Sequence, residues 1–202
     1  MGVEVVRKDI SKVERTPGGF TIDGAEFTHL VLATGSVPKT LDIPGAVYHL
    51  EPGDLEEGKN LLIVGGGDLA FDNALRAAAS GMSVTILVRD RPTANETLLK
   101  EARSIGVVEI LGDASDIVPK EGSYLFGNNV YDMIAVFIGR IPNRNLIEDP
   151  GVLDVELPNF TTSIKGLYIV GDAALGTLSQ TALASGSGIA AAMHIARTVR
   201  DR

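Results

Sequence analysis

The sequence predicts an α/β fold built around a central βαβ unit, and three observations support this prediction. A short apolar strand, Leu61–Val64, runs directly into the glycine-rich turn Gly65–Gly67. A helical stretch, Asp68–Ser80, follows the turn and ends at Gly81. A second apolar strand, Ser83–Val88, comes next. Strand, glycine turn, helix and strand in this order are typical of one repeat of a doubly wound parallel sheet.

The glycine turn has the spacing Gly-x-Gly-x-x-Ala, which suits a dinucleotide. Gly65 permits the tight turn, Gly67 has no side chain to block a pyrophosphate, and Ala70 lets the helix pack closely on the strand. The helix N-terminus offers free N–H groups to an anion. We expect Gly65, Gly66, Gly67, Asp68 and Ala70 to bind NAD(P) or FAD. The alternative is a βαβ turn that uses glycine only for its geometry.

The rest of the chain is predicted to alternate short strands with two further helices. Turn residues such as Pro17-Gly, Asp23-Gly and Gly106 separate the apolar runs. We expect strands over Val3–Val6, Phe20–Ile22, Phe27–Ala33, Val107–Leu111, Asp132–Ile138 and Leu167–Val170, and helices over Glu96–Ile105 and Thr181–Val199. The polar stretch Glu51–Asn60 is interpreted as a domain boundary.

Two arginines follow the second strand of the βαβ unit, at the position that normally contacts the adenosine ribose. An acidic residue there would bind the ribose 2′-hydroxyl, but this chain has Val88 followed by Arg89 and Arg91. Two guanidinium groups can clamp a 2′-phosphate, which favours NADPH over NADH. Asp90 between them opposes this preference, and a solvated turn is the alternative interpretation.

Composition excludes several classes of function. The net charge of −8 leaves no basic surface for nucleic acid. No apolar run approaches the length of a membrane span, and the first residues lack the features of a signal peptide, so we expect a cytoplasmic protein. The chain has no cysteine, so neither disulfides nor thiolate metal sites are possible. His29, His49 and His194 are scattered, and we expect no metal site.

Three strand ends with small residues carry a resemblance to a known family. They are Ala33-Thr34-Gly35, Gly65–Gly67 and Val170-Gly171-Asp172. In this order they resemble the pyridine-nucleotide-dependent flavoprotein reductases of the thioredoxin-reductase-like branch. The resemblance implies a Rossmann-like NAD(P)H-binding domain, residues 51–140, inserted into a partial FAD-binding domain made of residues 1–50 and 141–202.

The resemblance also implies roles for individual residues. Val136–Asn143 is similar to the return strand of the NAD(P)H domain, which adds Ile138 and Gly139 to that site. Leu178–Ala184 is similar to the start of the helix under the flavin. The residues that the family's pattern places at FAD are Thr34, Gly35, Gly171, Asp172, Gln180, Thr181 and Ala182. No residue is a convincing acid, base or nucleophile, which suits hydride transfer between cofactors.

Two departures from the family pattern define the functional alternatives. The given sequence contains no counterpart of the family's first βαβ unit, which holds the ADP half of FAD, and it has no C-x-x-C motif. We therefore expect NAD(P)H oxidation through FAD toward an acceptor that is not a dithiol. This is similar to the thioredoxin-reductase-type ferredoxin–NADP reductases.

FAD is expected only if the missing half is supplied by a preceding segment or a second chain. The alternative is a non-catalytic nucleotide-binding module or one subunit of a split flavoprotein. A homodimer is expected by analogy alone.

Overall fold

The structure is a computed structural model that describes residues 3–147 and 154–200. The chain forms two compact units. The inner unit is Pro38–Arg140, and the outer unit combines Met1–Val37 with Ile141–Arg202. Strands β5 (Ser36–Pro38) and β13 (Arg140–Pro142), which contain the two division points, form a two-stranded sheet.

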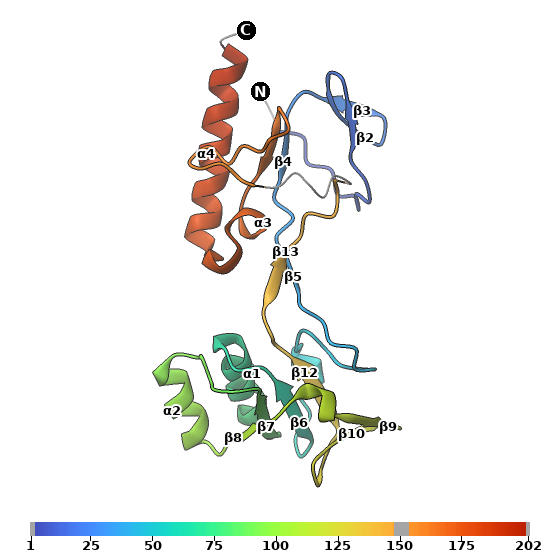
Figure 1. Cartoon of the computed structure of the whole chain (residues 1–202), viewed down its shortest axis with the longest axis vertical. Helices are drawn as coiled ribbons and strands as arrows, with labels where there is room; N and C mark the ends of the chain where they lie inside the picture. The colour runs from blue at the N-terminus through green and yellow to red at the C-terminus, as the bar shows by residue number, and fades with distance from the viewer. Residues whose placement is uncertain (1–2, 148–153, 201–202) are drawn as a thin grey trace. The chain divides into compact units, whose positions relative to one another are not determined.

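The inner unit is built on a four-stranded parallel sheet in the order β12-β6-β7-β8 (Figure 1). The crossovers from β6 to β7 and from β7 to β8 are the helices α1 and α2. Because all four strands are parallel, their carboxyl ends meet at one edge of the sheet. The elements are β6 Asn60–Val64, α1 Asp68–Ala79, β7 Ser83–Val88, α2 Glu96–Ser104, β8 Val108–Leu111 and β12 Met133–Val136.

The two central strands, β6 and β7, are apolar over most of their length because both faces of the sheet are covered. Leu61 and Ile63 of β6 pack in one cluster with Phe71 and Ala74 of α1. Leu62, between them in sequence, belongs to a second cluster on the opposite face. Burying each such aliphatic side chain contributes roughly 1.5–3 kcal/mol, so the predicted βαβ unit is also the centre of stability of this unit.

An antiparallel meander covers the second face of the sheet. Its strands are β9 Val118–Lys120, β10 Ser123–Phe126 and β11 Asn129–Tyr131, in the order β11-β10-β9. Tyr124 and Phe126 of β10 pack on the cluster that contains Leu62. The Tyr124 hydroxyl also donates a hydrogen bond to the Pro44 carbonyl at 2.9 Å.

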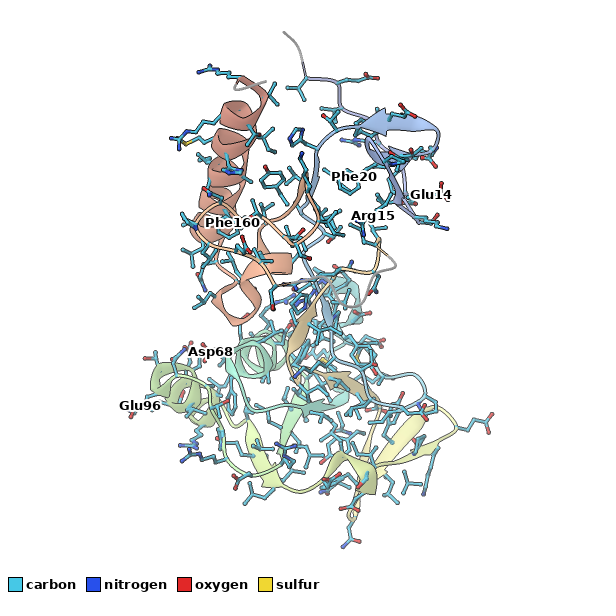
Figure 2. All side chains as sticks on the ribbon, turned by 45° about the horizontal axis from the view of Figure 1, so that its top comes forward. Glu14, Arg15, Phe20, Asp68, Glu96 and Phe160 are labelled. Atoms are coloured by element: carbon cyan, nitrogen blue, oxygen red, sulfur yellow. The ribbon has the colours of Figure 1, made fainter. Side chains whose placement is uncertain are left out.

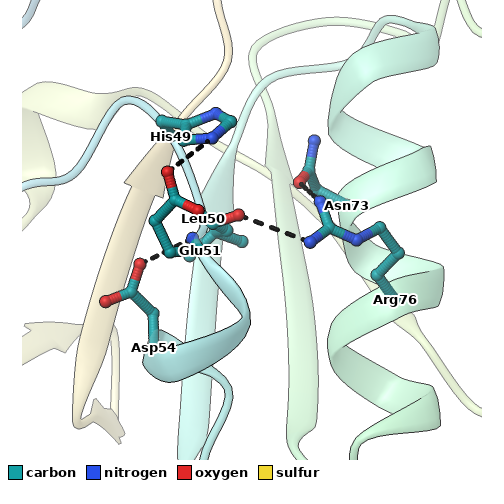
Figure 3. A network of polar contacts seen from close by, with 6 residues as sticks. All are labelled: His49, Leu50, Glu51, Asp54, Asn73 and Arg76. Carbon is teal, nitrogen blue, oxygen red and sulfur yellow. Dashed lines mark hydrogen bonds and ion pairs between the residues drawn. The ribbon is translucent and has the colours of Figure 1, made fainter.

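The connector before β6 is held against the sheet and α1 by polar contacts (Figure 3). Val47 bridges to Ala135 of β12. Arg76 of α1 donates to the Leu50 carbonyl at 3.4 Å and to Asn73 Oδ1 at 3.1 Å. The exposed His49 contacts Glu51 at 3.1 Å, so it belongs to a surface pair. A 3₁₀ turn, η1 (Pro52–Asp54), ends the connector.

The outer unit combines a three-stranded meander with a two-stranded parallel sheet. The meander is β1 Glu14–Thr16, β2 Gly19–Ile22 and β3 Ala25–Phe27, and the parallel pair is β4 Leu30–Leu32 with β14 Leu167–Ile169. After β14 come α3 Asp172–Leu175, η3 Gly176–Leu178 and α4 Thr181–Arg200. Phe20 and Phe160, both labelled in Figure 2, belong to the two apolar clusters of this unit.

Several sequence predictions need correction. Val3–Val6 forms no strand, and Val3, Val5 and Val6 are all exposed. An apolar run becomes a strand only where a partner strand is present, and none pairs with it among the described residues. The run Phe27–Ala33 is divided between the end of β3 and β4. The meander β9–β11 was not predicted, because its short strands alternate with turn residues and lack a long apolar run.

The contact-based division of the chain falls at residues 37/38 and 140/141. The sequence instead predicts a division at residues 50/51 and 140/141, into an NAD(P)H-binding domain and a partial FAD-binding domain. That division remains a prediction. None of the helices within residues 3–147 and 154–200 has the length and hydrophobicity that a membrane crossing requires.

Candidate functional site

The turn between β6 and α1 requires glycine at its first position. Gly65 has a φ of +149°, and a Cβ placed on it would lie 2.3 Å from the Phe137 carbonyl oxygen, which follows β12. The same Cβ would lie 3.3 Å from the Cβ of Ala70, which is fully buried in α1. Gly65 and Ala70 therefore let turn, helix and neighbouring strand approach one another closely.

Gly67 differs from Gly65, because the space beside it is open. Its backbone is extended, with φ −94° and ψ 177°, and it is the N-cap of α1. A Cβ on Gly67 would meet only Thr93 Oγ1, at 3.9 Å. Among the described residues, packing of the protein therefore does not require glycine at this position.

The start of α1 also presents backbone donors. The Ala70 N–H donates to the Gly67 carbonyl at 3.0 Å. The N–H groups of Gly67, Asp68 and Leu69 have no hydrogen-bond partner within residues 3–147 and 154–200. Free N–H groups at the start of a helix of this length, next to open space, favour an anionic group.

The segment that follows β7 folds back onto the glycine turn. The Gly66 carbonyl accepts hydrogen bonds from Thr93 N at 2.7 Å, Ala94 N at 3.0 Å and Thr93 Oγ1 at 3.3 Å. Asp68 Oδ1 accepts from Asn95 N at 2.7 Å. These bonds fix the loop that carries the two arginines against the start of α1. Figure 2 labels Asp68 and Glu96 at the starts of α1 and α2.

A pocket of about 740 Å³ lies at the carboxyl ends of the four strands of the inner unit. A volume of this order suits a small-molecule or cofactor site. Of the residues predicted from sequence, the pocket is lined by Gly65, Gly66, Gly67, Arg89, Arg91, Ile138 and Gly139. Asp68 and Ala70 are not among its lining residues, because Asp68 holds Asn95 and Ala70 packs in the core.

Charges of both signs line the pocket. Lys39, Arg89 and Arg91 are basic, whereas Asp90 and Asp113 are acidic. The hydrogen bond that Asp113 accepts from the Ser115 N–H, at 2.8 Å, lowers the pKa of Asp113, and a bond with the Ser115 side chain and the charge of Arg89 add to this. Asp113 is therefore ionised at neutral pH.

Sequence reasoning missed several residues that line or support this pocket, among them the polar residues Lys39, Thr93, Asn95 and Asp113. Asn95 caps α2 by accepting from Leu98 N at 3.0 Å, and an Asn directly before a helix is a common cap. Asp113 caps the 3₁₀ turn η2 (Ala114–Asp116), and Asp commonly begins a turn by accepting the backbone N–H two residues later. Thr93 lies in the same short polar loop as Asn95. Lys39 comes from a distant connector, and only the fold brings it to the pocket.

The site residues predicted in the outer unit fall at the ends of its parallel strands. Thr34 and Gly35 follow β4, and Gly171 and Asp172 follow β14, which pairs with β4 in parallel register. The Gly171 N–H donates to the buried Ser187 Oγ at 2.8 Å, so Gly171 is fixed against α4. Gly171 has a φ of +62°.

The other outer-unit residues are partly engaged and partly exposed. The Thr34 hydroxyl donates to the Asn143 carbonyl, and the Gly35 carbonyl accepts from the Asn143 N–H at 2.9 Å. Gln180, Thr181 and Ala182, which lead into α4, are exposed. Within the described residues, no group of three or more His, Asp or Glu side chains could hold a metal ion.

Parallel strands joined by helices, with a glycine turn opening onto a pocket at their carboxyl ends, define a mixed α/β protein with a parallel sheet. Residues 2–188 match the model of the pyridine nucleotide-disulphide oxidoreductase family. The chain belongs to this family, in its thioredoxin-reductase-like branch, but it has no cysteine and so no C-x-x-C. Proteins of this family are NAD(P)H- and FAD-dependent oxidoreductases.

Individual relatives are distant. A thioredoxin reductase of Peptoclostridium litorale is 25% identical, and the match covers 99% of this chain and 75% of the relative. A thioredoxin reductase of Chlamydia trachomatis is 27% identical, and the match covers 99% of this chain and 76% of the relative. Both alignments extend over 243 positions, so the relatives carry additional residues within the span that this shorter chain matches.

Solved structures show the same fold. The thioredoxin reductase of Lactococcus lactis superposes with a TM-score of 0.78 at 24% identity, covering 96% of this chain and 75% of that one. The bacillithiol disulfide reductase of Bacillus cereus superposes with a TM-score of 0.70 at 19% identity, and the match covers 94% of this chain and 70% of that one. At these identities the likeness defines the fold alone.

Proposed function

We propose that the inner unit binds NAD(P)H, with the pyrophosphate against Gly65–Gly67 and the first N–H groups of α1. The open space beside Gly67 is the observation that carries this proposal, because no packing within the described chain requires glycine there. The free donors of Gly67, Asp68 and Leu69 face the same end of α1 and support it. Arg89 and Arg91 lie on the pocket where the adenosine ribose would end.

Ile138 and Gly139 extend the proposed site beyond the phosphates. They follow β12, which is adjacent to β6, and both line the pocket. A backbone wall at this position would orient the far half of a dinucleotide and exclude water from it. The bound nicotinamide would supply the hydride, and the protein would supply position and surroundings.

The residues of the outer unit fit only part of an FAD site. Thr34, Gly35, Gly171, Asp172, Gln180, Thr181 and Ala182 offer backbone and side-chain contacts at the ends of β4 and β14. The sequence contains one glycine fingerprint, however, and it belongs to the inner unit. We therefore infer that FAD-dependent electron transfer requires a phosphate cradle from a further segment or a second chain.

A second candidate function is a nucleotide-binding module without flavin chemistry, or one subunit of a split flavoprotein. The glycine fingerprint and the pocket both belong to the inner unit, which supports nucleotide binding by this unit alone. A colourless chain that binds NAD(P)H would support the module. Co-purification of a chain with its own glycine fingerprint would support the split flavoprotein. A yellow protein carrying FAD would support the oxidoreductase.

The binding proposal is tested by titrating the full chain with NADH and with NADPH, following nicotinamide fluorescence. We expect saturable binding with a Kd below about 1 mM for at least one of them. Gly67→Thr places a branched side chain in the open space while keeping a residue that can cap a helix. We expect this variant to weaken binding by at least about tenfold.

Gly53→Ala is the matched control. Gly53 lies in the inner unit, and no heavy atom lies within 4 Å of a Cβ at this position. Its affinity should equal that of the unaltered chain. Undiminished binding by a folded Gly67→Thr variant would refute the proposed position of the pyrophosphate.

A further inference from the structure

The loop between β7 and α2, residues 89–95, carries Arg89 and Arg91 and is called the arginine loop here. Strand register places Asp113 beside this loop. In the parallel pair of β7 and β8, Val88 is opposite Leu111. The Gly112 N–H donates to the Val88 carbonyl at 3.1 Å, so the two strands are still hydrogen-bonded where they end. Arg89 follows β7 directly, Asp113 comes two residues after β8, and both line the same pocket.

The carboxylate of Asp113 is fixed in place. A Cβ on the preceding Gly112 would lie 2.6 Å from Phe126 Cζ and 3.2 Å from Leu87 Cδ1, so the strand end is packed tightly against its neighbours. Asp113 Oδ1 accepts the Ser115 N–H at 2.8 Å as the cap of η2. The hydrogen bonds from Ser115 and the charge of Arg89 lower the pKa of Asp113, so its negative charge persists across the physiological pH range.

A fixed negative charge at this place acts on one part of the ligand. The strand end after β7 is where a nucleotide-binding α/β sheet distinguishes a ribose 2′-hydroxyl from a 2′-phosphate. Arg89 and Arg91 attract a phosphate there, whereas Asp113 repels it and offsets the charge of Arg89. The arginines alone would predict a preference for NADPH. The carboxylate of Asp113, which follows the neighbouring strand β8, opposes this preference.

We propose that Asp113 is a specificity-determining residue of the nucleotide site, whose fixed carboxylate lowers the affinity for 2′-phosphorylated dinucleotides relative to their 2′-hydroxyl counterparts. This inference rests on the proposed function of the inner unit. A residue that follows β8 thus contributes to cofactor choice, in addition to the glycine fingerprint and the arginine loop.

The experiment uses the full chain and two probes, ADP-ribose and 2′-phospho-ADP-ribose, which differ only at the ribose 2′ position. Asp113→Asn removes the charge but keeps an oxygen that can accept the Ser115 N–H. We expect this variant to change the ratio of the two dissociation constants by about fivefold to tenfold in favour of the 2′-phosphate. The change should shrink as salt is raised, because the interaction is between exposed charges.

Asp116→Asn is the matched control, since Asp116 lies in η2 and does not line the pocket. It should leave the ratio unchanged. If Asp113→Asn does not fold, Asp113→Ser removes the same charge while retaining a capping oxygen.

A ratio that stays within twofold in folded Asp113 variants, while both probes bind, would overturn this inference and leave the proposed function intact. An equal change in both dissociation constants would do the same. If neither probe binds the unaltered chain at millimolar concentration, this inference and the proposed function both fail.

Discussion

The inner and outer units both contain parallel strands that end in small residues. In the inner unit the two central strands, β6 and β7, have paired strands along both edges, whereas neither parallel strand of the outer unit does among those described. Leu61, Leu62 and Ile63 of β6 are fully buried, with β12 on one side and β7 on the other. In the outer unit, β4 pairs with β14 alone among the described strands, and its central residue Val31 is 41% exposed. The strand ends of the inner unit therefore surround a pocket, whereas β4 of the outer unit has one paired strand among those described.

Similar motifs therefore have different surroundings in the two units. At the end of β6, the neighbouring strands, α1 and the arginine loop converge on one pocket. At the ends of β4 and β14, the residues contact Asn143 and Ser187. The glycine turn after β6 therefore opens onto a pocket whose other walls come from the surrounding sheet.

The largest expected effect comes from replacing one glycine that follows a strand in each unit, Gly65 in the inner unit and Gly171 in the outer unit. Gly65→Ala should lower the free energy of unfolding by about 3 kcal/mol or more, because the added Cβ would collide with the Phe137 carbonyl. Gly171→Ala should cost less, about 1–3 kcal/mol, because its nearest neighbour would be Ala184 Cβ at 3.7 Å and only the backbone conformation, φ +62° with ψ −151°, is unfavourable. Urea denaturation followed by circular dichroism measures both. Equal costs would show that the two strand ends are equally packed.

Native-state hydrogen exchange should separate the units next. The amides of β6 and β7 should open with a free energy about 2 kcal/mol higher than those of β4 and β14, or about thirtyfold more slowly. The reason is the burial of both faces and both edges of β6 and β7. Similar protection in the two sheets would contradict the comparison.

Asp68 tests whether the arginine loop is held by α1. Asp68→Ala removes the acceptor for Asn95 N and should lower the free energy of unfolding by about 1–2 kcal/mol. Asp72→Ala, one turn further along α1 and exposed, is the control and should have little effect. We expect faster exchange of the Thr93, Ala94 and Asn95 amides in Asp68→Ala. Unchanged exchange there would mean that the loop is held by other contacts.

The smallest effect concerns the inner meander. Tyr124→Phe removes the hydrogen bond to Pro44 and should cost about 1 kcal/mol near neutral pH. Burial raises the pKa of Tyr124, so the unfolded chain loses this proton first and the stabilisation is lost as the pH rises above about 10. Melting curves at rising pH should therefore show a smaller alkaline loss in the variant than in the unaltered chain. The same loss in both would contradict the assignment to Tyr124.

The βαβ unit could be predicted from sequence because each of its parts carries a local signal. Leu61–Val64 is an uninterrupted apolar strand, Gly65–Gly67 is a turn, and Gly81 ends the helix. The same reasoning was wrong for Val3–Val6, where apolar residues have no partner strand among those described. Local pattern indicates what a segment can form, but pairing decides whether it does.

The site was predicted in the same uneven way. The glycines and arginines lie within one motif, and the structure brings them to one pocket. Lys39 and Asp113 reach that pocket from a connector and a neighbouring strand, so strand order and register decide their place. Neither can be read from a motif, although the Asp113-x-Ser115 turn is a local signal that an acidic cap is present.

The most direct test of the central claim is a crystal structure of the chain grown with NADH or NADPH. The account predicts the pyrophosphate within hydrogen-bonding distance of the N–H groups of Gly67, Asp68 and Leu69, with the adenosine ribose next to the loop that carries Arg89 and Arg91. An empty niche beside Gly67, or a nucleotide bound elsewhere on the chain, would contradict it.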